Sequence, residues 1–168
     1  MRKLDKILNI IDQISEWSGK TVSFFICALA LIVGYEVVAR YIFKSPTLWV
    51  HETSAMMFGT FIIIGGAFTA YMGGHVNMDL VQNLLSTRIR ALVNVLTFFI
   101  AFAFLSAIIW KGGVTAWKSV KMLEHASTQW GPPIYQFRVM LPLGAILLLL
   151  QLIAKLIRDI GVLISGKE

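Results

Sequence analysis

Four residues whose side chains could form specific polar or aromatic contacts lie on either side of the junction between two long apolar segments. Glu36 and Arg40 lie near the end of the first segment, and Trp49 and Glu52 lie at the start of the second. In a helix, Glu36 and Arg40 share a face, with the acid four residues before the base, which is the favourable order for an ion pair. Glu52 is a second candidate partner for Arg40. Such a cluster can clamp the two segments together, dock a partner subunit, or anchor a helix end at the membrane surface.

His75 and Asp79 form a second pair at helical spacing, just after the second apolar segment. An imidazole and a carboxylate four residues apart can bind a metal ion or relay a proton. A pair of this kind at a membrane surface is more often a structural hydrogen bond, and we favour that interpretation.

The rest of the sequence offers little for catalysis. Haem binding inside a membrane needs paired histidines at depth, whereas His51, His75 and His125 lie at the ends of apolar segments. Cys27 is the only cysteine, so an internal disulfide is excluded. The centres of the apolar segments lack the charged groups that an independent ion-coupled transporter needs. We therefore predict that the chain is not an enzyme, binds no cofactor and transports nothing alone.

The elements that hold these residues follow from composition. Of the 168 residues, 57% are hydrophobic and 14% are charged, against about 45–50% and 25% in a soluble domain. The charges are also segregated between apolar runs, and a membrane-spanning helix needs ~20 apolar residues. We predict an all-α integral membrane protein, one membrane domain over residues 1–168, with transmembrane helices over about 21–43, 50–73, 89–111 and 135–160.

The first residues are patterned differently. Leu4, Ile7, Leu8, Ile11 and Ile14 recur at helical spacing, and polar residues occupy the opposite face. This pattern predicts an amphipathic helix over about 4–18 that lies along the membrane surface.

Basic residues indicate the orientation. With both termini inside, nine Lys and Arg residues fall on the inner side and six on the outer, which favours an N-in, C-in topology. The net charge of +6 gathers at helix ends beside lipid head groups, so it does not indicate nucleic acid.

Small residues and prolines predict where helices approach or bend. Gly66, Ala70 and Gly74 recur every four residues in the second helix, a spacing that permits close packing, most simply within this chain. Gly112-Gly113 is expected to bend or end the third helix, which leaves a long outer connection up to Gln136 that includes Trp130. Pro142 is expected to kink the fourth helix.

Three local patterns together resemble the small, DctQ-type membrane subunit of tripartite ATP-independent periplasmic (TRAP) transporters. The first is ARYIF followed by Trp49 and Glu52. The second is the glycine-bearing helix that leads into GGHVNMDLV. The third is Ser127 with WGPPIYQFRVMLPLG, which contains Pro142 and Gly144.

The resemblance implies a non-catalytic subunit of a bacterial or archaeal cytoplasmic (inner) membrane. Its implied partners are a large membrane subunit that carries substrate and sodium, and a periplasmic substrate-binding protein that delivers C4-dicarboxylates, sialic acid or other sugar acids. The small subunit would widen the scaffold against which the large subunit moves, in contact with membrane lipids.

Two alternatives remain open on the sequence. One is a four-helix, proton-coupled drug exporter with Glu36 as the proton carrier, which needs Glu36 deep in the membrane. The other is the membrane anchor of an oxidoreductase, which the positions of the histidines disfavour.

Overall fold

Four helices make up most of the computed structural model, which describes residues 2–72 and 87–165, with side chains for residues 6–72, 97–158 and 160. They are α1 (Arg2–Tyr41), α2 (Trp49–Tyr71), α4 (Thr87–Lys121) and α5 (Ile134–Ser165). Each contains a stretch long and apolar enough to cross a membrane. Within the described ranges, the only β-type pairing is an isolated bridge between His125 and Pro133. The predicted all-α membrane fold is confirmed.

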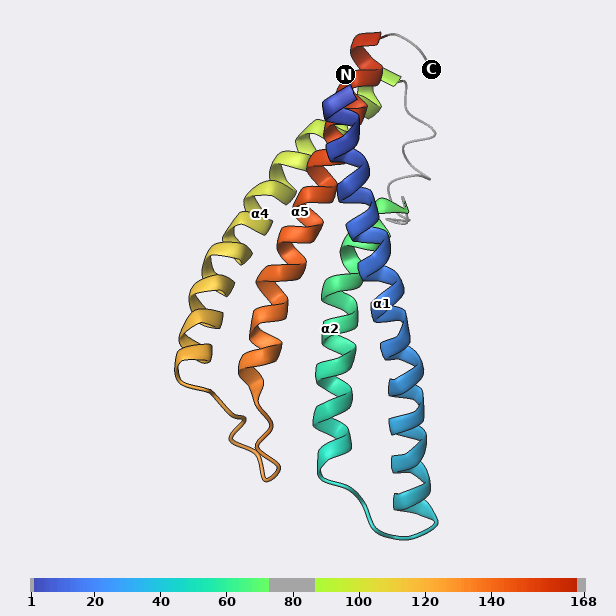
Figure 1. The fold of residues 1–168 in the computed structure, drawn as a ribbon, viewed down its shortest axis with the longest axis vertical. Helices are drawn as coiled ribbons and strands as arrows, with labels where there is room; N and C mark the ends of the chain where they lie inside the picture. Colours follow the sequence, from blue (N-terminus) through green and yellow to red (C-terminus); the bar gives the residue numbers. More distant parts are fainter. Residues whose placement is uncertain (1, 73–86, 166–168) are drawn as a thin grey trace.

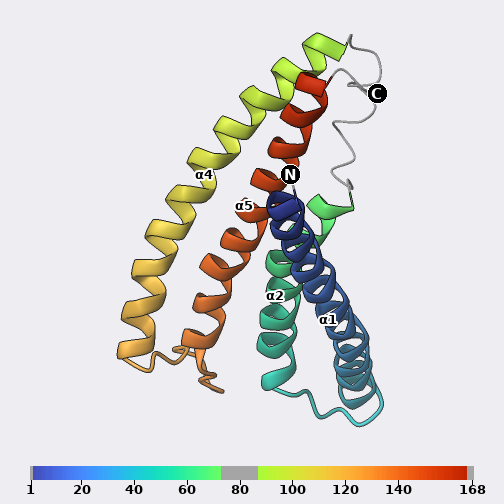
Figure 2. The same cartoon turned by 45° about the horizontal axis from the view of Figure 1, so that its top comes forward.

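The helices pack in the order α4, α5, α2, α1. The loops 42–48 and 122–133 lie at one end of the molecule, which we call the loop end, and the start of α1 and the end of α5 lie at the other, the terminal end (Figure 1). The two helix pairs spread apart toward the loop end (Figures 1 and 2). α1 and α5 make fewer contacts than the other packed pairs.

α1 differs from the prediction because it is one continuous helix of 40 residues. The amphipathic stretch at about 4–18 and the first transmembrane helix were predicted as separate elements. Gly19, at the predicted junction, is instead a packing residue: a Cβ there would lie 2.2 Å from Cγ of Phe68 in α2. The nearby hydroxyls of Ser18 and Thr21 bond carbonyls of the same helix, over 2.9 Å each. At ~1.5 Å per residue α1 is ~60 Å long, about twice the hydrocarbon thickness.

α4 also extends beyond its prediction, through Gly112-Gly113 to Lys121. A Cβ at Gly112 would lie 3.7 Å from atoms of both Leu141 and Pro142, so this glycine lies where α4 passes close to α5. The third helix therefore does not end at the two glycines, and the loop that follows begins only after Lys121. α2 covers Trp49–Tyr71 and α5 covers Ile134–Ser165, where the sequence predicts transmembrane spans of about 50–73 and 135–160.

The core between α2 and α5 depends on small residues. A Cβ at Gly144 would lie 2.3 Å from Cγ2 of Ile63 and 2.7 Å from its carbonyl oxygen. In α2, Ala67 is fully buried and Ala70 nearly so. The predicted packing within this chain is not found at Gly66, where no described atom comes within 4 Å of an added Cβ, and Gly74 lies outside the described residues. One residue before Ala67, Gly66 is turned by about 100° from the packed face.

Candidate functional site

Glu36 is the centre of a polar cluster at the loop end. Its carboxylate accepts hydrogen bonds from Arg40, over 3.0 Å to Nε and 2.6 Å to Nη2. It also accepts from the backbone N–H of Thr47 over 3.2 Å, and from the Thr47 hydroxyl. The Glu36 side chain is 13% exposed and that of Arg40 is 53% exposed. The predicted ion pair is present, and it ties the end of α1 to the loop that leads into α2.

Glu52 is not the ion-pair partner of Arg40. In the described structure its carboxylate accepts a hydrogen bond of 2.9 Å from the hydroxyl of Thr128, in the α4–α5 loop. Glu52 lies in the first turn of α2, and Arg40 is already held on its own helix by Glu36. The polar residues at the start of α2 therefore join α2 to the second loop.

Glu124 organises the α4–α5 loop. Its carbonyl accepts hydrogen bonds from the backbone N–H groups of Ile134 and Tyr135, over 3.0 and 3.4 Å. The first N–H groups of a helix lack partners in the helix itself, so this carbonyl caps α5. The Glu124 carboxylate also forms an ion pair of 2.6 Å with Arg138. This pair was not predicted from the sequence, because its members are 14 positions apart, one in the loop and one in α5.

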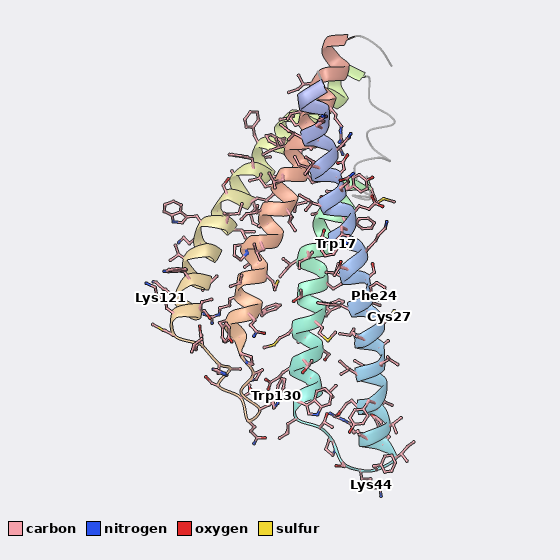
Figure 3. The ribbon with its side chains drawn as sticks, viewed as in Figure 1. Trp17, Phe24, Cys27, Lys44, Lys121 and Trp130 are labelled. Carbon is pink, nitrogen blue, oxygen red and sulfur yellow. The ribbon has the colours of Figure 1, made fainter. Side chains whose placement is uncertain are left out.

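Aromatic side chains gather at the same end. Trp49 stacks on Tyr35 of α1, with ring centroids 6.1 Å apart, and Trp130 is 44% exposed in the α4–α5 loop. Figure 3 labels Trp130 and Lys44 at the loop end. Other large apolar side chains at the end of α1 and in the two loops are also exposed: Tyr41, Ile42, Phe43, Leu48, Met122 and Leu123. An exposed apolar surface of this kind fits the membrane interface or another protein.

A second polar cluster joins α1 to α5 toward the terminal end. The Ser15 hydroxyl donates to Oε1 of Gln151 over 3.0 Å, and Nε2 of Gln151 donates to Oδ1 of Asp12 over 3.0 Å. Arg158 completes this cluster, the α1–α5 node, with an ion pair of 2.5 Å to Asp12. Ser15 is 1% exposed and Gln151 is 3% exposed. The node fixes the register between two helices that make few other contacts.

The α1–α5 node was not predicted from the sequence. The predicted amphipathic helix has Asp12 on its polar face, and the fourth transmembrane helix was predicted without a role for Gln151. The available signal was the single amide of Gln151 inside the run LLLLQLIA, because a buried amide needs hydrogen-bonding partners.

The remaining predicted residues are placed as follows. Pro142 and Gly144 are buried in α5, Pro142 close to Gly112 and Gly144 against Ile63. They serve packing inside the chain. His75 and Asp79 lie outside the described residues.

Polar contacts connect the helices and loops at the loop end and join α1 to α5 toward the terminal end, with apolar packing between them. The sequence has no Asp, Glu, Lys or Arg in residues 21–35, 53–74, 91–110 or 139–154. The two outer helices of the described bundle expose large apolar side chains along their length, such as Phe24 and Leu31 on α1 and Ile100 and Phe104 on α4. This arrangement can support neighbouring apolar segments, but it supplies no charged group at mid-membrane to carry an ion.

Comparison with known proteins identifies the family. A family model described as the DctQ component of tripartite ATP-independent periplasmic transporters matches residues 29–161. The C4-dicarboxylate TRAP transporter small permease protein DctQ of Vibrio cholerae is 30% identical over 81 residues, which are 48% of this chain and 34% of that protein. The sialic acid TRAP transporter permease protein SiaT of Haemophilus influenzae is 25% identical over 95 residues, 56% of this chain and 15% of that protein.

The matches therefore span about a third or less of these two relatives' own lengths, whereas the family model covers most of this chain. Together with the four helices long and apolar enough to cross a membrane, these findings show that the chain is a multi-pass inner-membrane protein that belongs to the DctQ family of TRAP transporter components.

Proposed function

We propose that this chain is the small subunit that braces a large TRAP membrane subunit during uptake of an organic acid. In this proposal the large subunit carries substrate and sodium, and a periplasmic binding protein delivers the substrate. The names of the relatives support a C4-dicarboxylate, sialic acid or another sugar acid as the substrate class. The SiaT match, which covers only 15% of a longer permease chain, supports a close association between this fold and a larger transport unit.

The observation that carries the proposal is the pairing of polar ties at the helix ends with apolar packing between them. The polar groups of Glu36 and of the α1–α5 node bond other parts of the same chain. They therefore hold helices together and do not line a pathway for a substrate or an ion. A helper that serves as a support needs rigidity, and a carrier needs charged groups or broken helices near the midplane. The four described helices are continuous.

The position of Glu36 disfavours the drug-exporter alternative. Glu36 lies five residues before the end of α1, ~8 Å from the helix end at 1.5 Å per residue. Its carboxylate is occupied by Arg40 and Thr47. A proton carrier near the midplane would need a deeper position and a free carboxylate, so no second function is proposed.

We infer that both termini face the cytoplasm. The described structure places the start of α1 and the end of α5 at the terminal end, and both loops at the other (Figure 1). In the predicted topology, nine of the fifteen Lys and Arg residues lie on the same side of the membrane as the two termini. The positive-inside rule assigns the side with more basic residues to the cytoplasm. Reporter fusions should report cytoplasmic termini and a periplasmic position near Lys121, and a periplasmic C-terminus would overturn the inference.

Co-purification tests the proposed partnership. A tag on this chain should bring down the large subunit encoded with it, in a fixed ratio and in mild detergent. A tagged unrelated four-helix membrane protein, expressed at the same level, is the control. Failure of the two subunits to purify together under conditions that preserve uptake by membranes would contradict the bracing role.

A further inference from the structure

The last turns of α4 carry a cationic face that no other element of the described structure covers. α4 is an outer helix of the described bundle and packs on α5. At about 100° per residue, six exposed residues near its end fall within an arc of about 120°. They form what we call the α4 cationic face: Trp110, Lys111, Val114, Trp117, Lys118 and Lys121. The buried residues Leu105 and Ala116 lie on the opposite side of the helix.

The charge of this face is not balanced within the described part of the chain. α4 contains no Asp or Glu. Among the described residues, none of the three lysines forms an ion pair, and the nearest acid in the sequence, Glu124, pairs with Arg138 over 2.6 Å. The negative end of a helix dipole is equivalent to about half an elementary charge, against three ammonium groups. The face therefore suits an anionic ligand.

Lys118 and Lys121 can bind one anion together. They are three residues apart, so they are neighbours on the helix surface. The ammonium of Lys121 lies 5.2 Å from the ring centroid of Trp117, one turn back toward the start of α4, which is the direction in which helix side chains lean. An ammonium has three N–H donors, so contact with the indole leaves donors for a phosphate oxygen. Figure 3 labels Lys121 at the end of α4, on the side away from the other helices.

The same side of α4 continues into an apolar surface. Two to three turns before Trp110, the residues Phe99, Ile100 and Ala103 fall within the same arc. Phe99 and Ile100 are 62% and 73% exposed, and Trp110 and Trp117 are 76% and 64% exposed. Tryptophan and lysine gather where a helix passes from hydrocarbon to head groups. An acidic soluble protein would account for the lysines but not for this continuous change along one side, so the observations favour a lipid.

The position of the lysines along the helix agrees with a head-group contact. Residues 91–110 contain no charged residue and extend ~30 Å, which is the thickness of the hydrocarbon layer. Lys111 then lies at the edge of the hydrocarbon, and Lys118 and Lys121 follow ~10 and ~15 Å further along α4. Head groups occupy about 5–8 Å of each leaflet. The side chain of Lys121 extends back toward them, because its ammonium lies over Trp117.

From these observations we propose that the α4 cationic face binds an anionic phospholipid of the phosphatidylglycerol type, in the leaflet at the loop end. The lipid phosphate contacts the ammonium groups of Lys118 and Lys121 beside Trp117, and an acyl chain lies along the apolar surface of Phe99 and Ile100. Lipid binding at this face goes beyond the bracing role and does not depend on it.

Native mass spectrometry of the full chain in detergent tests this site, with phosphatidylglycerol and zwitterionic phosphatidylethanolamine as competing probes. The unsubstituted chain should retain phosphatidylglycerol in preference. Lys118→Gln and Lys121→Gln should each lower that retention about fivefold, which corresponds to the ~1 kcal/mol that one basic residue contributes at an anionic membrane surface. Retention of phosphatidylethanolamine should not change.

Matched variants separate the site from general charge and aromatic effects. Lys44→Gln removes another exposed lysine at the loop end, and Lys118→Arg keeps the charge on the face, so both should retain phosphatidylglycerol as the unsubstituted chain does. Trp117→Leu should lower this retention, whereas Trp130→Leu, in the α4–α5 loop, should not. Circular dichroism checks that each variant keeps its helix content, which is expected for Lys118→Gln and Lys121→Gln because both lysines are exposed.

Three results would overturn the proposal. The first is equal retention of the two lipids by the unsubstituted chain. The second is an equal loss in Lys44→Gln and Lys118→Gln, which would show an effect of net charge alone. The third is unchanged retention of phosphatidylglycerol in the folded Lys118→Gln and Lys121→Gln variants. If these variants also fail to co-purify with the large subunit, the face belongs to an acidic protein surface instead.

Discussion

The hydroxyl of Ser15 in α1 donates a hydrogen bond of 3.0 Å to the side-chain amide of Gln151 in α5, and both residues are almost completely buried. They are 136 residues apart in the chain. Because α1 and α5 make few other contacts, this bond and its neighbours at Asp12 and Arg158 determine how the first and last described helices meet.

Gln151→Leu should destabilise the chain. It removes the acceptor for Ser15 and one donor to Asp12, and a buried polar group without a partner costs ~1–3 kcal/mol. The double variant Gln151→Leu with Ser15→Ala should recover part of the loss, because the stranded hydroxyl is gone. Thermal unfolding in detergent, followed by circular dichroism, measures both.

Gln136→Leu is the matched control, since Gln136 is exposed on the same helix and makes only a long bond of 3.5 Å to Tyr135. An equal fall in melting temperature for Gln151→Leu and Gln136→Leu would contradict a structural role for the α1–α5 node.

Arg40→Ala should weaken the connection between α1 and α2. It leaves Glu36 without its ion-pair partner, and the effect should be smaller than that of Gln151→Leu because Arg40 is half exposed. Adding Glu36→Gln should recover part of the loss. Co-purification yield with the large subunit and melting temperature are the two measurements.

Glu52→Gln added to Arg40→Ala should give no recovery, because Glu52 bonds Thr128 and not Arg40. Normal yield and stability for Arg40→Ala alone would show that the residue only anchors a helix end in the head groups.

Gly144→Ala and Gly66→Ala should act in opposite directions. An added methyl at Gly144 meets Ile63 at 2.3 Å from a side-chain carbon and 2.7 Å from the carbonyl oxygen, so α2 and α5 must separate, at a cost of ~1–3 kcal/mol. At Gly66 no described atom lies within 4 Å, and alanine is favoured over glycine in a helix by up to ~1 kcal/mol. A destabilising effect at Gly66, measured by thermal unfolding, would place an undetected partner against that face.

The features that the sequence predicts well are local or are imposed by the membrane. The four spans follow from uninterrupted apolar runs and the bilayer thickness, and the Glu36–Arg40 pair follows from a spacing of four residues in one helix. The continuity of α1 could not be predicted, because a glycine between two helical patterns is typical of a helix end. Only the close approach of Gly19 to Phe68 shows that it is a packing site within one helix.

The α1–α5 node and the Glu52–Thr128 bond could not be predicted from the sequence for a different reason. Each joins residues from distant parts of the chain, so their pairing depends on the order in which the helices pack. Sequence spacing carries no information about that order. Gln151 could be recognised as a polar residue in need of partners, but not assigned to Ser15 and Asp12.

The proposed bracing role requires that this chain alone carries no substrate. Uptake of a radiolabelled organic acid, sialic acid or a C4-dicarboxylate, should be measured in proteoliposomes under an inward sodium gradient. Four preparations are compared: this chain alone, the large subunit with its binding protein, the complete three-component system, and the complete system without the gradient. We predict uptake only in the complete system with the gradient; sodium-driven uptake by this chain alone, or full uptake in its absence, would contradict the bracing role.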